Sequence, residues 1–169
     1  MEFSDDLICL SYGSKASFPT AQAGSDPQVN RILVHSRRAN RASEIGGVLH
    51  FGQGFFFQYL EGPADRVDAL YARICRDPRH EDVQRLTRRP IRSRRFRDWS
   101  MKFVVLDQAI EDVLQRHGLA AFNPYQFTPA MIDDLVVICT LGPEAAPDAD
   151  VGADRAISSR PWWRRIFSK

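Results

Sequence analysis

Two runs of strand-forming residues flank the short sequence Gly52-Gln53-Gly54, and this arrangement constrains the fold more than any other feature of the chain. Residues 46–51 and residues 55–60 are both rich in the aromatic and branched side chains that strands favour. A three-residue connection that contains glycine is typical of a β-hairpin. We therefore predict an antiparallel pair of strands across residues 46–60.

The segments around this hairpin complete an alternating order of strands and helices. They are a buried strand at residues 7–12, a helix from Asp26-Pro27 to about Asn40, a helix from Pro63 to Asp77-Pro78, and strands at residues 83–91 and 101–106. The order β-α-β-β-α-β, followed by one further strand, predicts an α+β fold with a ferredoxin-like sheet. Both of these helices are expected on one face of that sheet.

The rest of the chain predicts two more helices and then a tail. Residues 109–117 and residues 128–141 are the helical segments, and they are expected to cover the opposite face of the sheet. Residues 143–158 are rich in alanine, proline and aspartate, as linkers are, and residues 160–169 carry four bases around aromatic residues. We therefore predict a sheet domain at residues 1–106, a helical cap at 107–142, and a flexible linker with a basic, aromatic tail at 143–169.

Composition excludes several classes of protein. The 169 residues carry 23 Lys+Arg and 21 Asp+Glu, which gives a net charge of +2, and 44% of them are hydrophobic, so a disordered chain is excluded. No apolar run reaches the roughly 18 residues that a membrane-spanning helix needs. Three widely separated cysteines and an acidic N-terminus favour a cytoplasmic protein with reduced thiols over a secreted disulfide scaffold.

No motif for catalysis is present, and the chain is not expected to be an enzyme. There is no nucleophile elbow, phosphate-binding loop or metalloprotease motif, and none of the four histidines is followed three or four residues later by a second metal ligand. Gln58 is the unusual residue, because strand alternation gives it apolar neighbours on both faces. Such a buried amide either bonds structurally to its neighbours or binds the polar edge of a ligand, and Tyr12 on the first strand could stand beside it.

Five short segments, taken in order, resemble the BLUF family of blue-light photoreceptors that use flavin. The resemblance rests on Ser11-Tyr12, Ser36-Arg37-Arg38-Ala39-Asn40, Phe57-Gln58-Tyr59-Leu60-Glu61-Gly62, Asp77-Pro78-Arg79-His80 and Trp99-Ser100-Met101. Each motif alone is weak, but five in the right order over about a hundred residues are specific. The C-terminal helices also resemble those of short, stand-alone members. Where the family usually has Gly-Ile-Thr-Gly, this chain has Glu44-Ile45-Gly46-Gly47, and we expect the glutamate to alter the turn that follows Asn40.

The resemblance implies a cofactor and a role for each matching residue. The cofactor would be FAD, with FMN as the alternative, bound non-covalently in a slot between the two helices. Tyr12 would donate an electron and a proton, Gln58 would switch its hydrogen bonds, and Trp99 and Met101 would compete for the place beside Gln58. The residues implied to hold the flavin are Asn40 and Gln58 at the ring edge with Tyr12 nearby, Ile32 and Ile74 as walls, and Arg73, Asp77, Arg79 and His80 at the ribityl-phosphate end.

The resemblance also implies that the signal leaves through the last strand and the C-terminal helices. It would reach a separate effector protein or change the self-assembly of the chain, which is expected to form a homo-oligomer. No specific binding of nucleic acid is expected. Two alternatives stay open at this point. The nine arginines between Arg76 and Arg97, with only three acids among them, could form a module that binds nucleic acid or another anionic partner. A small acylphosphatase-like hydrolase shares the topology, but fold analogy alone supports it weakly.

Overall fold

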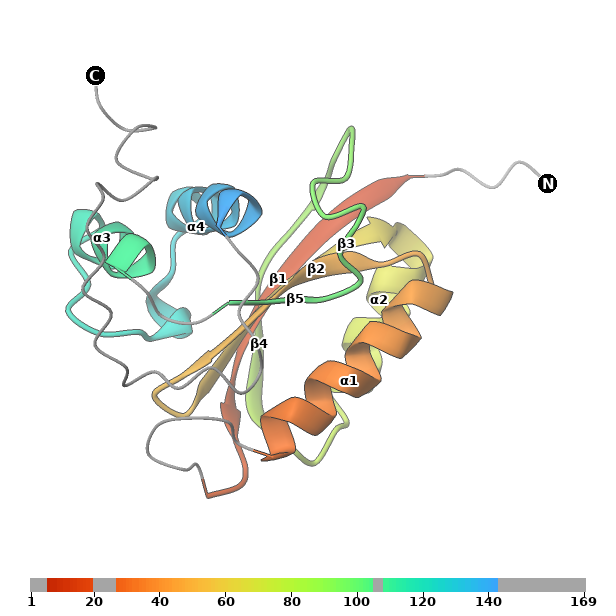
Figure 1. Ribbon diagram of the computed structural model, residues 1–169, viewed down its shortest axis with the longest axis horizontal. Coiled ribbons are helices and arrows are strands. Elements are labelled where there is room, and N and C mark those ends of the chain that lie inside the picture. Colours follow the sequence, from red (N-terminus) through yellow and green to blue (C-terminus); the bar gives the residue numbers. More distant parts are fainter. Residues whose placement is uncertain (1–5, 20–26, 105–107, 143–169) are drawn as a thin grey trace.

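A five-stranded sheet with helices on both faces forms the core of the molecule (Figure 1). The computed structural model describes residues 6–19, 27–104 and 108–142. The elements in chain order are β1 (Leu7–Ala16), α1 (Pro27–Ala42), β2 (Gly46–Gly52), β3 (Phe55–Pro63), α2 (Ala64–Ile74), β4 (His80–Pro90), β5 (Lys102–Val104), α3 (Gln108–Arg116), the 3₁₀ helix η1 (Pro124–Gln126) and α4 (Pro129–Leu141).

The strand order β4-β1-β3-β2-β5 confirms the predicted ferredoxin-like arrangement. Each of the first four strands pairs antiparallel with its neighbour, and β5 adds to the edge of β2 in parallel. The predicted hairpin is present, and its turn places Gln53 and Gly54 at φ 52° and 81°. Positive φ at both residues matches the right-handed twist of the flanking strands. The hairpin therefore fixes the register of β2 on β3.

The boundaries of several predicted strands differ in the structure. β1 and β3 run past their predicted ends at residues 12 and 60, to Ala16 and Pro63, because the two strands pair with each other over that greater length. β4 begins at His80, three residues before the predicted start, because it pairs with β1 as far as the last residue of that strand, Ala16. β5 begins at Lys102, and it contains three residues because residues 105–107, which include the end of the predicted strand, lie outside the described part of the chain. The predicted N-cap Asp26 also lies outside it.

Alternation along the strands gives each face of the sheet its own core. Helices α1 and α2 cover one face, as predicted, and bury Leu10, Leu49, Phe56 and Leu60 against Leu33. Helices α3 and α4 cover the other face, also as predicted, and their cluster contains Cys9, Val48, Phe57 and Tyr59. The apolar residues of β3 thus alternate between the cores beneath the two helical layers.

Helix α4 begins and ends at the residues that the sequence predicts. The side chain of Thr128 accepts a hydrogen bond from the amide of Met131, Pro129 occupies the first turn, and Gly142 ends the helix. Because its cluster includes strand residues, the C-terminal part of the described chain packs on the sheet rather than forming a separate core. Among the helices of the described residues, none is long and apolar enough to cross a bilayer.

Candidate flavin pocket

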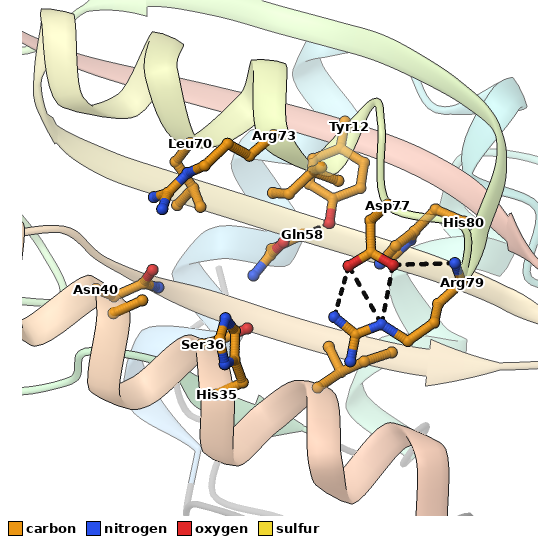
Figure 2. A pocket seen from close by; sticks show the side chains of 13 residues that line it. Tyr12, His35, Ser36, Asn40, Gln58, Leu70, Arg73, Asp77, Arg79 and His80 are labelled. Carbon is orange, nitrogen blue, oxygen red and sulfur yellow. Dashed lines mark hydrogen bonds and ion pairs between the residues drawn. The ribbon is translucent and has the colours of Figure 1, made fainter.

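A pocket opens between α1 and α2 above the central strands (Figure 2). Its cavity volume is about 100 Å³, and the space that also includes the solvent-open mouth is about 580 Å³. The structure brings nine of the eleven predicted site residues to this pocket: Tyr12, Ile32, Asn40, Gln58, Arg73, Ile74, Asp77, Arg79 and His80. Met101 lies behind Gln58 and does not line the pocket, and Trp99 lies on the other face of the sheet.

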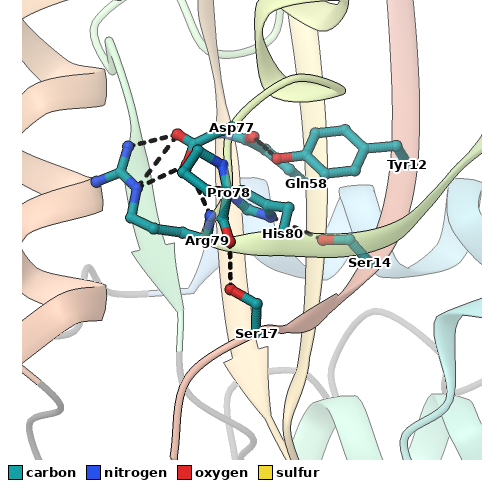
Figure 3. Close-up of polar contacts among 8 residues, drawn as sticks. All are labelled: Tyr12, Ser14, Ser17, Gln58, Asp77, Pro78, Arg79 and His80. Atoms are coloured by element: carbon teal, nitrogen blue, oxygen red, sulfur yellow. Dashed lines mark hydrogen bonds and ion pairs between the residues drawn. The ribbon is translucent and has the colours of Figure 1, made fainter.

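Tyr12 and Gln58 face each other across the β1–β3 pair. They are direct partners in the strand register, and both side chains are buried. The Tyr12 hydroxyl donates to Gln58 Oε1 at 2.5 Å (Figure 3). Burial, helped by the nearby Asp77 carboxylate, raises the pKa of Tyr12 well above its ordinary value. The phenol is therefore neutral at physiological pH and holds its proton in this bond.

A distortion of the sheet lies directly at Tyr12. The register between β1 and β4 shifts between Ser11 and Tyr12, so that Thr87 faces Ser11 and Arg85 faces Tyr12. On the regular side of this bulge the hydroxyls of Ser11 and Thr87 bond to each other at 2.6 Å. Bulges re-aim neighbouring side chains, and they are common next to functional sites.

The nitrogen of the Gln58 amide points to Met101. Gln58 Nε2 donates to Met101 Sδ at 3.3 Å, and Met101 is 1% exposed. Since an amide nitrogen carries two hydrogens, one N–H of Gln58 is left for another acceptor. Of the two residues expected to compete for this position, Met101 is the one beside Gln58. Trp99 packs in the cluster beneath α3 and α4, with the ammonium of Lys102 5.2 Å from its ring centroid.

Asn40 presents an acceptor to the pocket. Its Nδ2 donates to the carbonyl of Ser100 at 2.9 Å, while its Oδ1 is buried and has no hydrogen-bond partner among the described residues. A buried polar atom without a partner costs about 1–3 kcal/mol. In a pocket, such an atom indicates a ligand that donates a hydrogen bond there.

The turn after Asn40 departs from the family pattern without losing its hydrogen bonds. Glu44 adopts φ 54°, in the left-handed region that favours glycine, and its carboxylate pairs with the exposed Arg66. The amide of Ile45 still donates to the Asn40 carbonyl at 2.9 Å. The glutamate in the sequence is therefore accommodated by its own backbone, and Asn40 keeps its place at the end of α1.

The mouth of the pocket is closed on one side by the turn at residues 77–80 (Figures 2 and 3). Asp77 accepts hydrogen bonds from the backbone amide and the guanidinium of Arg79, and these bonds lower the pKa of Asp77 to about 2. The negative charge of Asp77 and the positive charge of Arg79 offset each other in this ion pair. Strand β1 fixes the turn, because Ser14 Oγ lies 2.8 Å from His80 Nδ1 and Ser17 donates to the carbonyl of Pro78. Burial lowers the pKa of His80 to about 4, so its ring is neutral at pH 7.

Four lining residues are additional to those predicted: His35, Ser36, Ala39 and Leu70. The first three follow Ile32 at three, four and seven residues along α1, so they share its face of the helix. Leu70 precedes Ile74 by one turn of α2. The spacing from Ile32 and Ile74 could have identified all four, once those two residues were placed at the ligand.

The arginines of β4 are partly neutralised by the fold. Arg88 forms a two-point ion pair with Asp68 of α2, and Arg89 forms one with Asp133 of α4. These pairs reduce the positive charge that the stretch between Arg76 and Arg97 presents to solvent. They weaken the alternative of a surface that binds nucleic acid.

Comparison with known proteins agrees with the geometry of the pocket. The family model of BLUF, described as sensors of blue light using FAD, matches residues 7–102. The chain belongs to the BLUF family. BLUF domains are described as sensors that use FAD.

Solved BLUF proteins share this fold. BlsA in its photo-activated state superposes with a TM-score of 0.73 at 25% identity, over 83% of this chain and 99% of that one. BlrB in its dark state superposes with a TM-score of 0.65 at 30% identity, over 82% of this chain and 98% of that one. Both likenesses extend beyond the matched residues 7–102, so they include part of the C-terminal helices.

Curated BLUF relatives are much longer proteins. The antirepressor BluF of Escherichia coli (strain K12), described as regulated by blue light and temperature, is 35% identical over 102 residues, which are 60% of this chain and 25% of BluF. The beta subunit of the photoactivated adenylate cyclase of Euglena gracilis is 35% identical over 121 residues, 71% of this chain and 12% of that protein. The chain thus spans between an eighth and a quarter of the length of these relatives.

Proposed function

We propose that this BLUF chain binds FAD non-covalently, with FMN as the alternative, and acts as a blue-light receptor in which Tyr12 and Gln58 form the switch. The observation that carries the proposal is the bond from the neutral Tyr12 hydroxyl to Gln58, made in a pocket where Asn40 offers a buried acceptor without a partner. A light-driven change in this bond would directly alter the hydrogen bonds that Gln58 makes to a flavin beside it.

The residues of the pocket fit an isoalloxazine ring. Ile32 of α1 and Ile74 of α2 offer apolar walls to its two faces. Asn40 has its Oδ1 and one N–H available, and these match the ring edge on which an N–H donor adjoins a carbonyl acceptor. The exposed side chain of Arg73 on α2 and that of Arg79 at the turn would hold the ribityl-phosphate end, together with Asp77 and His80.

The chemistry of the switch belongs to Tyr12 and Gln58. The flavin, when bound, supplies an electron acceptor that blue light excites. Tyr12 would give up an electron, and its hydroxyl proton would pass to the oxygen of Gln58 along the 2.5 Å bond while Gln58 Nε2 releases one of its two protons toward the reduced acceptor, so that the amide becomes its neutral tautomer. The electron and one proton would then return to the Tyr12 oxygen, which leaves Gln58 either as the tautomer or as a rotated amide that donates a hydrogen bond where it had accepted one. Reversion of the Gln58 side chain in the dark would restore the starting state, so the cycle consumes nothing.

Met101 is the group through which we expect the change at Gln58 to reach the rest of the protein. Its sulfur accepts the Gln58 N–H, and its carbonyl accepts a hydrogen bond from Arg37 Nε at 3.1 Å. Lys102, the next residue, begins β5. Loss of the contact with Gln58 would therefore shift β5 and, with it, the C-terminal helices. We propose that this chain acts as a homo-oligomer in the cytoplasm and that a separate effector protein receives its signal.

The test is a visible spectrum of the purified chain after reconstitution with FAD, in the dark and under blue light. We expect a flavin spectrum that shifts to the red without bleaching and returns in the dark. Gln58→Leu should keep the flavin and lose the shift, because the amide that donates to the ring edge is gone. Gln115→Leu, an exposed position on α3, is the matched control and should behave as the wild type.

A wild-type protein that stays colourless with both FAD and FMN would contradict the proposal. A Gln58→Leu protein that still shifts to the red would contradict the role of Gln58 while leaving flavin binding in place. Asn40→Ala tests the anchor separately: we expect weaker flavin binding in the dark, because the unpaired acceptor is removed.

A further inference from the structure

The 3₁₀ helix η1 touches the sheet at the residue that follows Tyr12. A Cβ atom built on Gly13 would lie 2.8 Å from Cβ and 2.9 Å from Cγ of Pro124, closer than such carbons approach in proteins. Strand alternation turns Tyr12 to the pocket and Gly13 to the opposite face. The backbone of β1 is therefore all that separates the photoactive side chain from a proline ring of the C-terminal part of the chain.

Tyr125 holds η1 in this position by contacts with three strands. Its hydroxyl donates to the carbonyl of Asp82 in β4 at 2.8 Å. Its ring meets the edge of Phe55 in β3 at 5.7 Å between centroids, and Lys15 Nζ of β1 lies 5.8 Å from its centroid. Asn123 caps the short helix by accepting from the Tyr125 amide. Tyr125 thus joins η1 to β1, β3 and β4.

Strand β1 is irregularly paired in the same region. Its register with β4 shifts at Tyr12 and again between Gly13 and Lys15, and Asp82 in the second irregularity has φ 50°. A bulge locally interrupts the ladder of hydrogen bonds that would otherwise fix a strand. Strand β3 pairs with β1 without a register shift through Tyr12 and Gly13, so the packing of Pro124 on Gly13 supports β1 where its pairing with β4 is irregular.

The other end of η1 leads directly to α4. Phe127 packs on Phe57, the neighbour of Gln58 in β3, with ring centroids 5.4 Å apart. Thr128 then caps α4 through the amide of Met131. A shift of η1 consequently moves the residues that begin α4, without any involvement of β5.

We propose that Pro124 is a positioning residue for Tyr12, and that its contact with Gly13 couples the state of the Tyr12–Gln58 pair to α4. The inference rests on the proposed photoreceptor function and adds a route to it, from β1 through η1, beside the one through Met101 and β5. Coupling of this kind is reciprocal: if a change at Tyr12 alters the packing of η1, a change in that packing alters the stability of the lit state.

The experiment measures light-minus-dark amide hydrogen exchange in α4, together with the rate of dark recovery, on the full chain loaded with FAD. Pro124→Gly removes the two carbon atoms that meet Gly13, and Gln126→Ala is the control in the same short helix, since the side chain of Gln126 is exposed. For Pro124→Gly we expect the red shift to remain, the light-dependent difference in α4 to disappear, and the recovery rate to change at least about fivefold.

Gly13→Ala approaches the same contact from the other side. The added methyl group would clash with Pro124 and push η1 away from β1, so we expect Gly13→Ala to change the rate of dark recovery. In the double variant Gly13→Ala/Pro124→Gly the methyl group has room again, and the recovery rate should return toward that of Pro124→Gly alone. A purely structural role for Pro124 would raise exchange in α4 equally in the dark and in the light and leave recovery unchanged. That result would overturn the proposal, as would a Pro124→Gly protein with wild-type behaviour.

Failure of the photoreceptor function is distinguishable from failure of this inference. Without flavin binding or a red shift in the wild type, the proposed function fails and the coupling fails with it. A normal red shift in the wild type and in Pro124→Gly, with an unchanged light-dependent difference in α4 in both, rejects the route through η1 and leaves the receptor function in place.

Discussion

Lys102 is a buried cation that joins β5 to the end of α4, and its removal gives the sharpest test of how the C-terminal helices are held. Its side chain is 1% exposed, and Nζ donates to the carbonyls of Cys139 at 2.7 Å and of Gly142 at 2.5 Å. These carbonyls belong to the last turn and the C-cap of α4, where unpaired acceptors and the negative end of the helix dipole favour a cation.

The expected loss of unfolding free energy in Lys102→Met is the difference between two opposing contributions. Each hydrogen bond from a charged donor contributes about 1.5–3 kcal/mol, so Lys102→Met removes roughly 3–6 kcal/mol. Methionine fills much of the same volume, and the cost of keeping an ammonium out of water is removed with the charge, which offsets part of this loss. We expect the free energy of unfolding to fall by about 3 kcal/mol, which for a domain of this size lowers Tm by roughly 6–12 °C.

Urea unfolding followed by circular dichroism measures this change. Arg92→Met is the control, because Arg92 is an exposed cation, and its unfolding free energy should stay within about 0.5 kcal/mol of the wild type. A Lys102→Met protein within about 0.5 kcal/mol of the wild type would refute the argument, since the two carbonyls would then not depend on the ammonium.

Three further predictions concern the pocket and the sheet. Tyr12→Phe should keep the flavin but lose the red shift, and it should lower the free energy of unfolding by about 1–2 kcal/mol because Gln58 Oε1 loses its donor; a persisting red shift in the visible spectrum would exclude Tyr12 as the donor. Burial lowers the pKa of His50 and of His80 to about 4, so the unfolded state takes up protons on these histidines before the folded state does as pH falls below 6.5. The free energy of unfolding should therefore drop by up to about 1.4 kcal/mol per pH unit for each histidine between pH 6 and 5. Urea titrations of His50→Leu should show a weaker dependence of the unfolding free energy on pH, and the same dependence as in the wild type would contradict the lowered pKa of His50. Gly47→Ala should destabilise by about 3 kcal/mol or prevent folding, because its Cβ would lie 2.1 Å from the Tyr59 carbonyl oxygen. At Gly52 the added Cβ would meet side-chain atoms of His50, the nearest at 2.8 Å, and no backbone atom, so Gly52→Ala should cost less; equal unfolding midpoints for the two alanine variants would contradict this.

Much of the fold is predictable from the sequence because its signals are local. The glycine turn of the β2–β3 hairpin, the apolar stripe of α2 and the Thr128-Pro129 start of α4 each specify their own element. Alternation along β3 correctly separates Phe56 from Phe57, and so assigns the two faces of the sheet to different cores. The ends of β4 and β5 are less predictable, since they depend on which residues their partner strands offer.

The parts of the site that escaped prediction arise from contacts between distant segments. Nothing near Lys102 indicates that a lysine in a strand will be buried beneath a helix that ends forty residues later. The bulge at Tyr12 depends on the match between β1 and β4, and the contact of Gly13 with Pro124 depends on how η1 is docked. Glu44 keeps a left-handed conformation that its residue type disfavours, because the turn around it satisfies the carbonyl of Asn40. The domain boundaries and the roles of the individual site residues stay predictions.

The most direct test of the account is the light-minus-dark infrared spectrum of the FAD-loaded chain, in the region of the flavin C4 carbonyl stretch. If Gln58 changes its hydrogen bonds as proposed, the C4 carbonyl gains a stronger bond in the light and its stretch moves to lower wavenumber. The shift should disappear in both Tyr12→Phe and Gln58→Leu. A wild-type spectrum with no change at this carbonyl, or a shift that persists in Gln58→Leu, would contradict the central claim that the Tyr12–Gln58 pair is the switch.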